Sequence, residues 1–345
     1  MANSDQAPND RQRLFRLLAF GVPAALGVAI LLVVATSRGM LEMNLEHGTL
    51  ELRDPAKLMY ALNHDESGHV VLYDETLGWR NPPNHKGRTF GNPLWINAKG
   101  LRGRDRPYAK PVDTRRILVL GDSYTWGFDV GDDEVFTEVL EDRLAEEPRK
   151  TEVINTGVSG WGTDQEYLFF IEEGVRYQPD VVVLAFYVLN DFNENTVSQQ
   201  HGHYKPYFRD TNLTLAGVPV PKATETVEPE MTGTGAIEIT VALIEGIKAE
   251  CDKRDIEFVV MVFGTIFRPF DKQMLSYTEP FFEALAHVPG LQYFNLDDRF
   301  VARKIGRKQL VAGNRGAHWN AYGHSMAAEE LHGYLREQGL VAAPR

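Results

Sequence analysis

The chain has 345 residues, of which 43% are hydrophobic, 24% charged and 10% aromatic, an ordinary globular profile that excludes a disordered or low-complexity protein. Its 36 Lys and Arg residues against 48 Asp and Glu residues give a net charge of -12, which repels phosphate backbones and argues against nucleic acid as a partner. A single cysteine, Cys251, excludes an internal disulfide and a paired-cysteine metal site.

The first predicted element is an apolar segment over residues 17–37. It carries no charge over about 21 residues, and as a helix it would span roughly 30 Å, the hydrocarbon thickness of a bilayer. Three arginines lie just before it within residues 1–16, and only Arg38 lies just after it. This asymmetry predicts a cytoplasmic tail over residues 1–16, a single anchor in the inner membrane and an extracytoplasmic (periplasmic) remainder. A cleaved signal peptide is the alternative, but its apolar core would be shorter, about 7–15 residues.

Residues 38–114 are rich in Asn, Pro, Gly and Arg, which predicts a stalk and a wrapping segment. One short apolar run, His69–Tyr73, indicates a little β-structure there. From Arg116 onward, short apolar runs alternate with stretches of helical periodicity. This alternation is typical of a parallel sheet that helices cover on both faces, so we expect one α/β domain over residues 115–340.

Five short, mostly apolar runs in this domain predict strands, as expected for a sheet buried on both faces. They cover residues 117–120, 152–155, 179–187, 256–263 and 291–296. Helical periodicity predicts helices over residues 135–144, 163–177, 235–253 and 324–337. Thr163–Glu166 is expected to form a capping box at the start of the second helix, and a loop-rich insertion is expected at about residues 191–232.

Four sequence blocks follow strands, at the edge where parallel sheets carry their functional residues. Ser123 lies in Gly121–Gly127 after the first strand, Gly160 follows the second, Asn190 follows the third and His318 comes after the fifth. A serine hydroxyl is a weak nucleophile unless a base takes its proton. The oxyanion of a tetrahedral intermediate needs donors, which a glycine backbone N–H and an asparagine amide can supply. The four blocks therefore indicate acyl transfer through serine.

In their order, these blocks resemble those of the SGNH (GDSL-like) hydrolase superfamily. Leu77–Arg80 and Ile96–Asp105 look like the lead-in found in its bacterial extracytoplasmic members. The resemblance covers roughly residues 75–340. It implies a flavodoxin-like three-layer α/β sandwich with a five-stranded parallel sheet, here preceded by one N-terminal transmembrane helix.

The same resemblance implies roles for the four residues. Ser123 would be the nucleophile and His318 the base. The backbone amides of Ser123 and Gly160 and the side chain of Asn190 would form the oxyanion hole. Neither a metal nor a cofactor is implied. No Gly-x-Ser-x-Gly motif surrounds Ser123, so the α/β-hydrolase fold is not supported.

The sequence departs from the family pattern three residues before His318. Members usually carry an aspartate there that orients the imidazole, and this chain has Arg315 instead. Loss of such an acid can cost several powers of ten in rate. Three interpretations remain open. A backbone carbonyl could hold the second ring nitrogen and leave a serine–histidine dyad, an acid from elsewhere such as Asp297 or Asp298 could supply the contact, or catalysis has faded and the site binds without cleaving.

Other polar residues have simpler expected roles. Asp122 is expected to brace its own loop, Asn320 to cap the final helix and His324 to be structural. His201 and His203 hint at a metal, but two histidines without a carboxylate or cysteine partner are poor evidence for one.

Three tryptophans, Trp126, Trp161 and Trp319, lie within the four blocks. Aromatic platforms suit sugar rings, but tryptophans in strand-end loops serve packing as often, so both roles remain open. The glycines around Gly160 do not follow the first strand and do not spell a dinucleotide-binding motif.

The sequence thus predicts a membrane-anchored serine esterase, or an O-acetyltransferase, that acts on acyl esters. An acylated envelope or exported polysaccharide is the expected substrate by analogy with the superfamily. The expected partners are the membrane, through residues 17–37, and the ester substrate, together with a possible membrane protein. The alternative is a catalytically weak binding or scaffold subunit of a membrane complex, which Arg315 favours.

Overall fold

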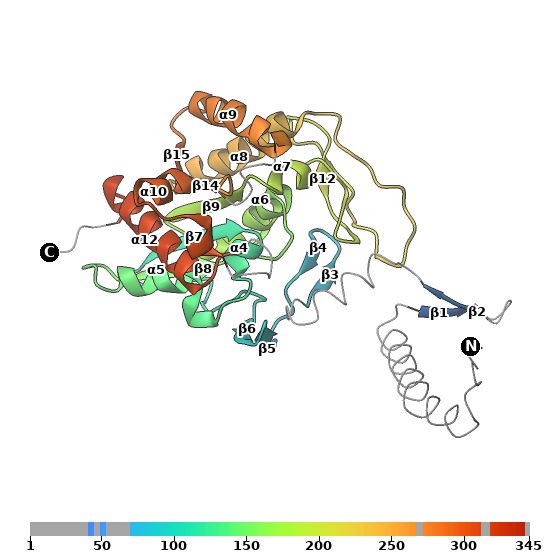
Figure 1. Ribbon diagram of the computed structural model, residues 1–345, viewed down its shortest axis with the longest axis horizontal. Coiled ribbons are helices and arrows are strands. Elements are labelled where there is room, and N and C mark those ends of the chain that lie inside the picture. Colours follow the sequence, from blue (N-terminus) through green and yellow to red (C-terminus); the bar gives the residue numbers. More distant parts are fainter. Residues whose placement is uncertain (1–40, 45–48, 53–69, 267–271, 312–317, 342–345) are drawn as a thin grey trace, which may run out of the picture. The chain divides into compact units, whose positions relative to one another are not determined.

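The computed structural model describes residues 41–44, 49–52, 70–266, 272–311 and 318–341 (Figure 1). The chain divides into two units, Met1–Asp65 and Glu66–Arg345. In the first unit, the described residues form an antiparallel pair of strands, β1 (Leu41–Asn44) and β2 (Thr49–Leu52). The predicted anchor at residues 17–37 lies outside the described residues. Among the helices that are described, none combines the length and hydropathy needed to cross a bilayer.

The second unit is built on a five-stranded parallel sheet, in the order β15-β14-β9-β7-β8. Its strands are β7 (Arg115–Gly121), β8 (Thr151–Asn155), β9 (Val181–Tyr187), β14 (Glu257–Phe263) and β15 (Gln292–Asn295). Every residue of β9 is buried, as expected for the central strand of a sheet covered on both faces. Counted along the chain, this is the flavodoxin order 2-1-3-4-5, so the five predicted strands and their parallel arrangement are confirmed.

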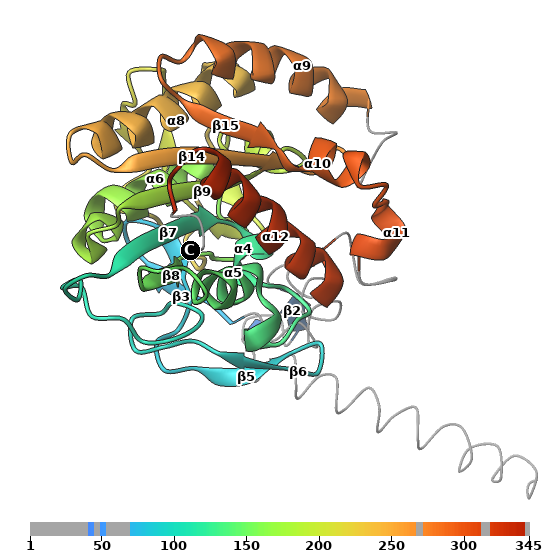
Figure 2. The same cartoon turned by 90° about the vertical axis from the view of Figure 1, so that its left-hand side faces the viewer.

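Two layers of helices cover the sheet (Figure 2). One layer contains α6 (Thr163–Glu172), α8 (Ala236–Asp252) and α9 (Lys272–His287), in which α8 packs on both α6 and α9. In the other, α12 (Ala321–Glu337) packs on α5 (Phe136–Leu144) and α10 (Leu296–Ala302). The helices α9 and α10 were not predicted. Pro280 interrupts the pattern inside α9, and α10 begins directly where β15 ends.

The predicted capping box of α6 is wrong by one residue. The cap is Gly162, whose N–H donates to the Gln165 side chain at 3.2 Å. A second donor near the helix start, the Asp164 N–H, reaches Asn195 Oδ1 at 3.2 Å. Because that partner comes from the insertion, the helix start is set by a tertiary contact as well as by its own sequence. Glu166 does not serve as the box acid, and within the part of the chain that the structure describes its buried carboxylate has no hydrogen-bond partner.

The wrapping segment forms two hairpins before it reaches the sheet. They are β3 (Leu72–Asp74) with β4 (Gly78–Arg80), and β5 (Lys86–Thr89) with β6 (Asn92–Trp95). The short apolar run predicted to be β-structure overlaps β3. Residues from Glu66 onward belong to the same unit as the sheet.

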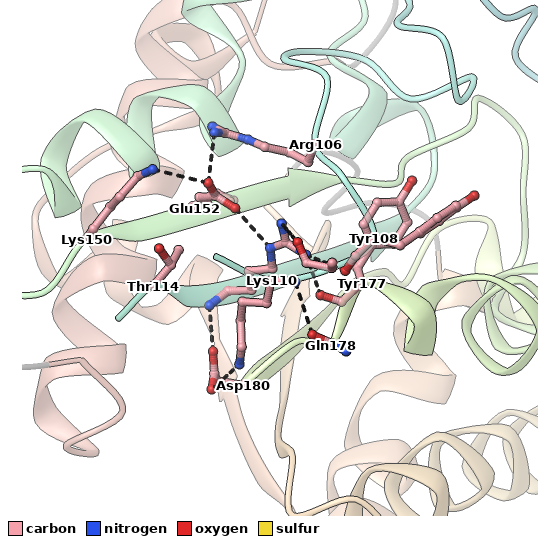
Figure 3. Close-up of polar contacts among 12 residues, drawn as sticks. Arg106, Tyr108, Lys110, Thr114, Lys150, Glu152, Tyr177, Gln178 and Asp180 are labelled. Atoms are coloured by element: carbon pink, nitrogen blue, oxygen red, sulfur yellow. Dashed lines mark hydrogen bonds and ion pairs between the residues drawn. The ribbon is translucent and has the colours of Figure 1, made fainter. Parts of the chain in front are cut away.

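A cluster of ion pairs holds the end of this segment at the start of the strands (Figure 3). Arg116 is fully buried and donates to Glu152 Oε2 at 2.9 Å and to the carbonyl of Tyr177 at 2.7 Å. Arg106 contacts the same carboxylate at 3.3 Å, and Lys110 pairs with Asp180 at 2.7 Å. Removing one partner from a buried pair of this kind costs about 3–5 kcal/mol, so the cluster fixes this end of the sheet.

The insertion contains a short helix and two hairpins. These are α7 (Asp191–Glu194), β10 (Gln199–Gln200) with β11 (His203–Tyr204), and β12 (Tyr207–Phe208) with β13 (Leu215–Ala216). Lys205 holds the insertion to α6, because its buried ammonium pairs with Asp164 and also donates to the carbonyl of Glu194 at 3.0 Å.

Candidate active site

Ser123 is the first residue of α4 (Ser123–Trp126), a single helical turn directly after β7. Asp122 caps this turn by accepting the Tyr124 N–H at 2.9 Å, which confirms its predicted bracing role. Gly121 is required before it, since a Cβ there would collide with Thr125 Oγ1. The turn therefore places the Ser123 hydroxyl, half-buried, beyond the carboxyl end of the sheet.

The structure brings Ser123 and His318 together, although they are far apart in the sequence. Ser123 Oγ lies 2.8 Å from His318 Nε2, a hydrogen-bonding distance. Two aromatic rings flank the imidazole: Phe128 is stacked on it with centroids 4.5 Å apart, and Tyr124 lies tilted at 4.9 Å. The orientation of the His318 ring is therefore fixed by packing as well as by hydrogen bonding.

The residues that follow His318 hold it in this position. Trp319 is fully buried and forms a bridge with Val311. Asn320 caps α12, as predicted, by accepting the Gly323 N–H at 2.8 Å. His324 is buried against Phe136, and burial lowers its pKa to about 3, so it remains neutral and structural, as expected.

Arg315, which replaces the usual acid, lies outside the described residues. Among the described residues, the carboxylate of Asp297 makes no hydrogen bond to His318. Its Oδ2 accepts from the N–H of Gly264 at 2.9 Å and the hydroxyl of Thr265 at 2.6 Å, and so holds the turn after β14. Asp298 is exposed. The interpretation that one of these two aspartates orients the imidazole therefore finds no support in the described geometry.

Gly160 lies in the turn after β8, with φ at +77°, a conformation that favours glycine. Its N–H donates to no other described backbone group, as an oxyanion donor requires. The wrapping segment supports this turn through a reciprocal pair of contacts. Trp79 Nε1 donates to the carbonyl of Ser159 at 3.1 Å, and Trp161 Nε1 donates to the carbonyl of Trp79 at 2.9 Å.

Asn190 lies after β9, beside the residue that precedes Ser123. Its Nδ2 donates to Asp122 Oδ2 at 3.0 Å and to Glu194 Oε2 at 3.2 Å. Its Oδ1 is buried and has no hydrogen-bond partner among the described residues. Two carboxyl groups thus hold the amide that is expected to serve the oxyanion hole.

These two carboxyl groups belong to a buried acidic cluster behind the serine, which also contains Glu166 and Asp191. Burial raises the pKa of Asp122 to about 6. Burial and the nearby Asp122 charge raise the pKa of Glu194 to about 8. Sequence reasoning missed Glu194. Its spacing could have indicated a contact with Asn190, because residues four apart on a helical turn face each other and Glu194 lies four residues after Asn190.

The remaining candidate binding residues are three tryptophans and two histidines, and the described structure does not gather them into a binding site. The three tryptophans of the blocks, Trp126, Trp161 and Trp319, are each at most 2% exposed, so they pack in the core and offer no platform. His203 packs on Trp79 with centroids 5.5 Å apart, and His201 lies against the Gly160 turn. Within the described part of the chain, no three histidine, cysteine, aspartate or glutamate side chains are grouped as metal ligands.

A comparison with curated protein sequences gave no match. Similar solved structures include a lipase/acylhydrolase from Enterococcus faecalis, with 15% identity, a TM-score of 0.45 and coverage of 67% of this chain and 98% of that one. An acetylxylan esterase from Geobacillus stearothermophilus, solved as a catalytic mutant, has 15% identity and a TM-score of 0.45 over 66% of this chain and 97% of that one. At these low TM-scores, the structural similarity carries no weight. The GDSL-like lipase/acylhydrolase family model matches residues 119–326, more than half of the chain, so the protein belongs to that family.

Proposed function

We propose that this protein is a serine ester hydrolase or acyltransferase that handles small acyl groups, acetate foremost. The observation that carries the proposal is the 2.8 Å contact between Ser123 Oγ and His318 Nε2. A base at this distance can take the serine proton directly, which makes the hydroxyl a competent nucleophile.

In the proposed reaction, Ser123 Oγ attacks the ester carbonyl while His318 Nε2 accepts its proton. The oxyanion receives hydrogen bonds from the N–H groups of Ser123 and Gly160 and from the Asn190 amide. Collapse of the intermediate expels the alcohol, which takes the proton back from the imidazolium and leaves an acyl-serine. Water or a second alcohol then attacks the acyl-serine, and the same steps run in reverse. The protein is a hydrolase if water accepts the acyl group and a transferase if an alcohol accepts it.

The flanking rings support this chemistry without an aspartate at position 315. An acid in that place normally fixes the imidazole orientation and stabilises the cation that forms. Phe128 and Tyr124 restrict the ring, and their faces attract a cation by about 0.5–2 kcal/mol each when water is excluded. A serine–histidine pair between two aromatic rings is therefore the arrangement that we propose to be active.

The substrate and location are also part of the proposal. The resemblance to extracytoplasmic superfamily members favours an acylated carbohydrate of the envelope or an exported polysaccharide. The uncharged segment at residues 17–37 and the arginines before it favour a single-pass inner-membrane anchor.

A labelling and turnover experiment on the full-length chain tests the proposal. The purified protein is given p-nitrophenyl acetate, a fluorophosphonate probe and, in a separate reaction, acetyl ester with an oligosaccharide acceptor. Turnover, labelling or transfer that disappears in Ser123→Ala supports the enzyme. Equal background in the wild type and Ser123→Ala in all three assays would favour the scaffold subunit. In that case Arg315→Asp would restore activity if the lost acid alone were responsible.

A further inference from the structure

The insertion reaches back to the oxyanion hole through one buried side chain. Glu194, at the end of α7, is 1% exposed. Its Oε2 accepts from Asn190 Nδ2 at 3.2 Å, and its Oε1 accepts from Gln200 Nε2 in β10 at 2.9 Å. His201, next in that hairpin, places Nε2 3.8 Å from the same Oε1. Glu194 therefore connects the hairpin to the amide that would stabilise the oxyanion.

We propose that Glu194 is the positioning residue for the Asn190 oxyanion donor, and that it works as the neutral carboxylic acid. This inference rests on the proposed esterase function. The Asn190 amide has two hydrogens, one directed to Asp122 and the other to Glu194. In this proposal the oxyanion shares the hydrogen directed to Glu194, so the acceptor strength of Glu194 decides how readily that hydrogen is shared.

The charge of Glu194 determines whether that sharing succeeds. A carboxylate accepts hydrogen bonds about twice as strongly as a neutral oxygen, so ionised Glu194 would compete with the oxyanion for the hydrogen. It would also place a negative charge beside the developing one, in a buried site where such repulsion is large. The neutral acid avoids both penalties and still orients the amide.

The surroundings of Glu194 favour the neutral form at pH 7. Its burial and the nearby Asp122 charge raise its pKa to about 8, while Asp122, with a pKa of about 6, is largely ionised. The groups that face Glu194 come from its own helix, α7, and from four other parts of the fold. They are the carboxyls of Asp122, Glu166 and Asp191, the buried ammonium of Lys205, the amide of Gln200 and the imidazole of His201. The hydrogen bonds from Asn190 and Gln200 and the ammonium of Lys205 favour the ionised form, but burial and the Asp122 charge outweigh them, and the ammonium is already paired with Asp164.

The test compares pH profiles of kcat and KM for p-nitrophenyl acetate between pH 6 and 10, with Ser123→Ala as the background. We expect the wild type to lose kcat above about pH 8. Glu194→Gln, a neutral isostere, should keep kcat at pH 7 within about threefold and lose the alkaline decline. Glu194→Ala should lower kcat about 10- to 100-fold with little change in KM, because an oxyanion donor acts only in the transition state. Glu228→Gln, an exposed glutamate of the same insertion, is the matched control.

Three results would overturn the proposal: Glu194→Ala with at least half of the wild-type kcat, Glu194→Gln as damaged as Glu194→Ala, or an alkaline decline that persists in Glu194→Gln. A readout independent of turnover separates this failure from failure of the esterase function. In asparagine-labelled protein, the side-chain NH₂ resonances of Asn190, identified by their loss in Asn190→Ala, should shift with a midpoint near pH 8. The step near pH 8 should be absent in Glu194→Gln, whereas a step near pH 6 from Asp122, which accepts from the same amide, should remain. If the wild type lacks turnover dependent on Ser123 but shows this titration, the esterase function and the oxyanion role fail, while the contact of neutral Glu194 with Asn190 stands; if turnover is present but the titration is absent, the Glu194 proposal alone fails.

Discussion

Replacing Phe128 by leucine removes one of the two rings that flank His318, the proposed catalytic base. The Phe128 ring is stacked on His318 with centroids 4.5 Å apart and an interplanar angle of 28°. The imidazole carries a positive charge only while the proton is in transit. The attraction between the ring face and that cation, about 1–2 kcal/mol at this half-buried site, therefore stabilises the transition state more than the ground state.

Each 1.36 kcal/mol of lost transition-state stabilisation lowers the rate about tenfold. Losing about 1–2 kcal/mol therefore predicts a fall in kcat of about 5- to 30-fold with KM little changed. The assay is steady-state hydrolysis of p-nitrophenyl acetate, with the folded fraction checked by circular dichroism. Phe294→Leu is the matched control. Its side chain is 7% exposed against 6% for Phe128, and it stacks at 4.3 Å on Tyr334 instead of on the base.

The reasoning is refuted if Phe128→Leu keeps kcat within twofold of the wild type while remaining folded. It is also refuted if Phe294→Leu loses as much activity, because the effect would then be one of general stability. Phe128→Tyr, which keeps the ring, should restore most of the rate.

Three further predictions concern buried polar groups. Asp297→Asn should keep kcat within a few-fold, because Asp297 holds the turn after β14; a loss of about 10³ or more would instead identify it as the acid of a triad. Lys205→Met should lower the free energy of unfolding in urea by about 3–5 kcal/mol, and adding Asp164→Asn should recover part of it; a loss below about 1 kcal/mol would contradict the buried pair. His324 has a folded-state pKa of about 3, below its ordinary value, so the unfolded chain binds the extra proton and stability falls as the pH drops below about 6.5. His324→Asn should reduce that slope by about 1.4 kcal/mol per pH unit between pH 6 and 4, and an unchanged slope in urea titrations would contradict it.

Much of the fold was predictable because its central strands have a simple pattern. The run at Val181–Tyr187 is apolar throughout, as a strand buried on both faces must be. Once the strands are parallel, the residues that follow them meet at one edge, so Ser123 and His318 could be brought together from the sequence. The contact between their side chains bears this out.

The parts that could not be predicted depend on contacts between distant segments. The start of α6 is also held by Asn195 from the insertion, which accepts the Asp164 N–H, and no local sequence motif predicts that contact. Phe128 and Glu194 support the site through a ring and a carboxyl group, and in the sequence they are an ordinary loop phenylalanine and an ordinary helix glutamate. Their roles follow only from where the fold places them.

The reciprocal contacts between Trp79 and the Ser159–Trp161 turn have a practical consequence for shortened versions of the chain. The family match begins at residue 119, about forty residues after that tryptophan. A fragment trimmed to the family boundaries would keep the nucleophile and the base but lose the indole that braces the glycine turn. Crystallographic or screening work on this protein should therefore start upstream of Leu72 and include all of β7 and α12, which the family boundaries also cut; a loss of function in a shorter piece would reflect these missing structural contacts rather than a missing reactive group.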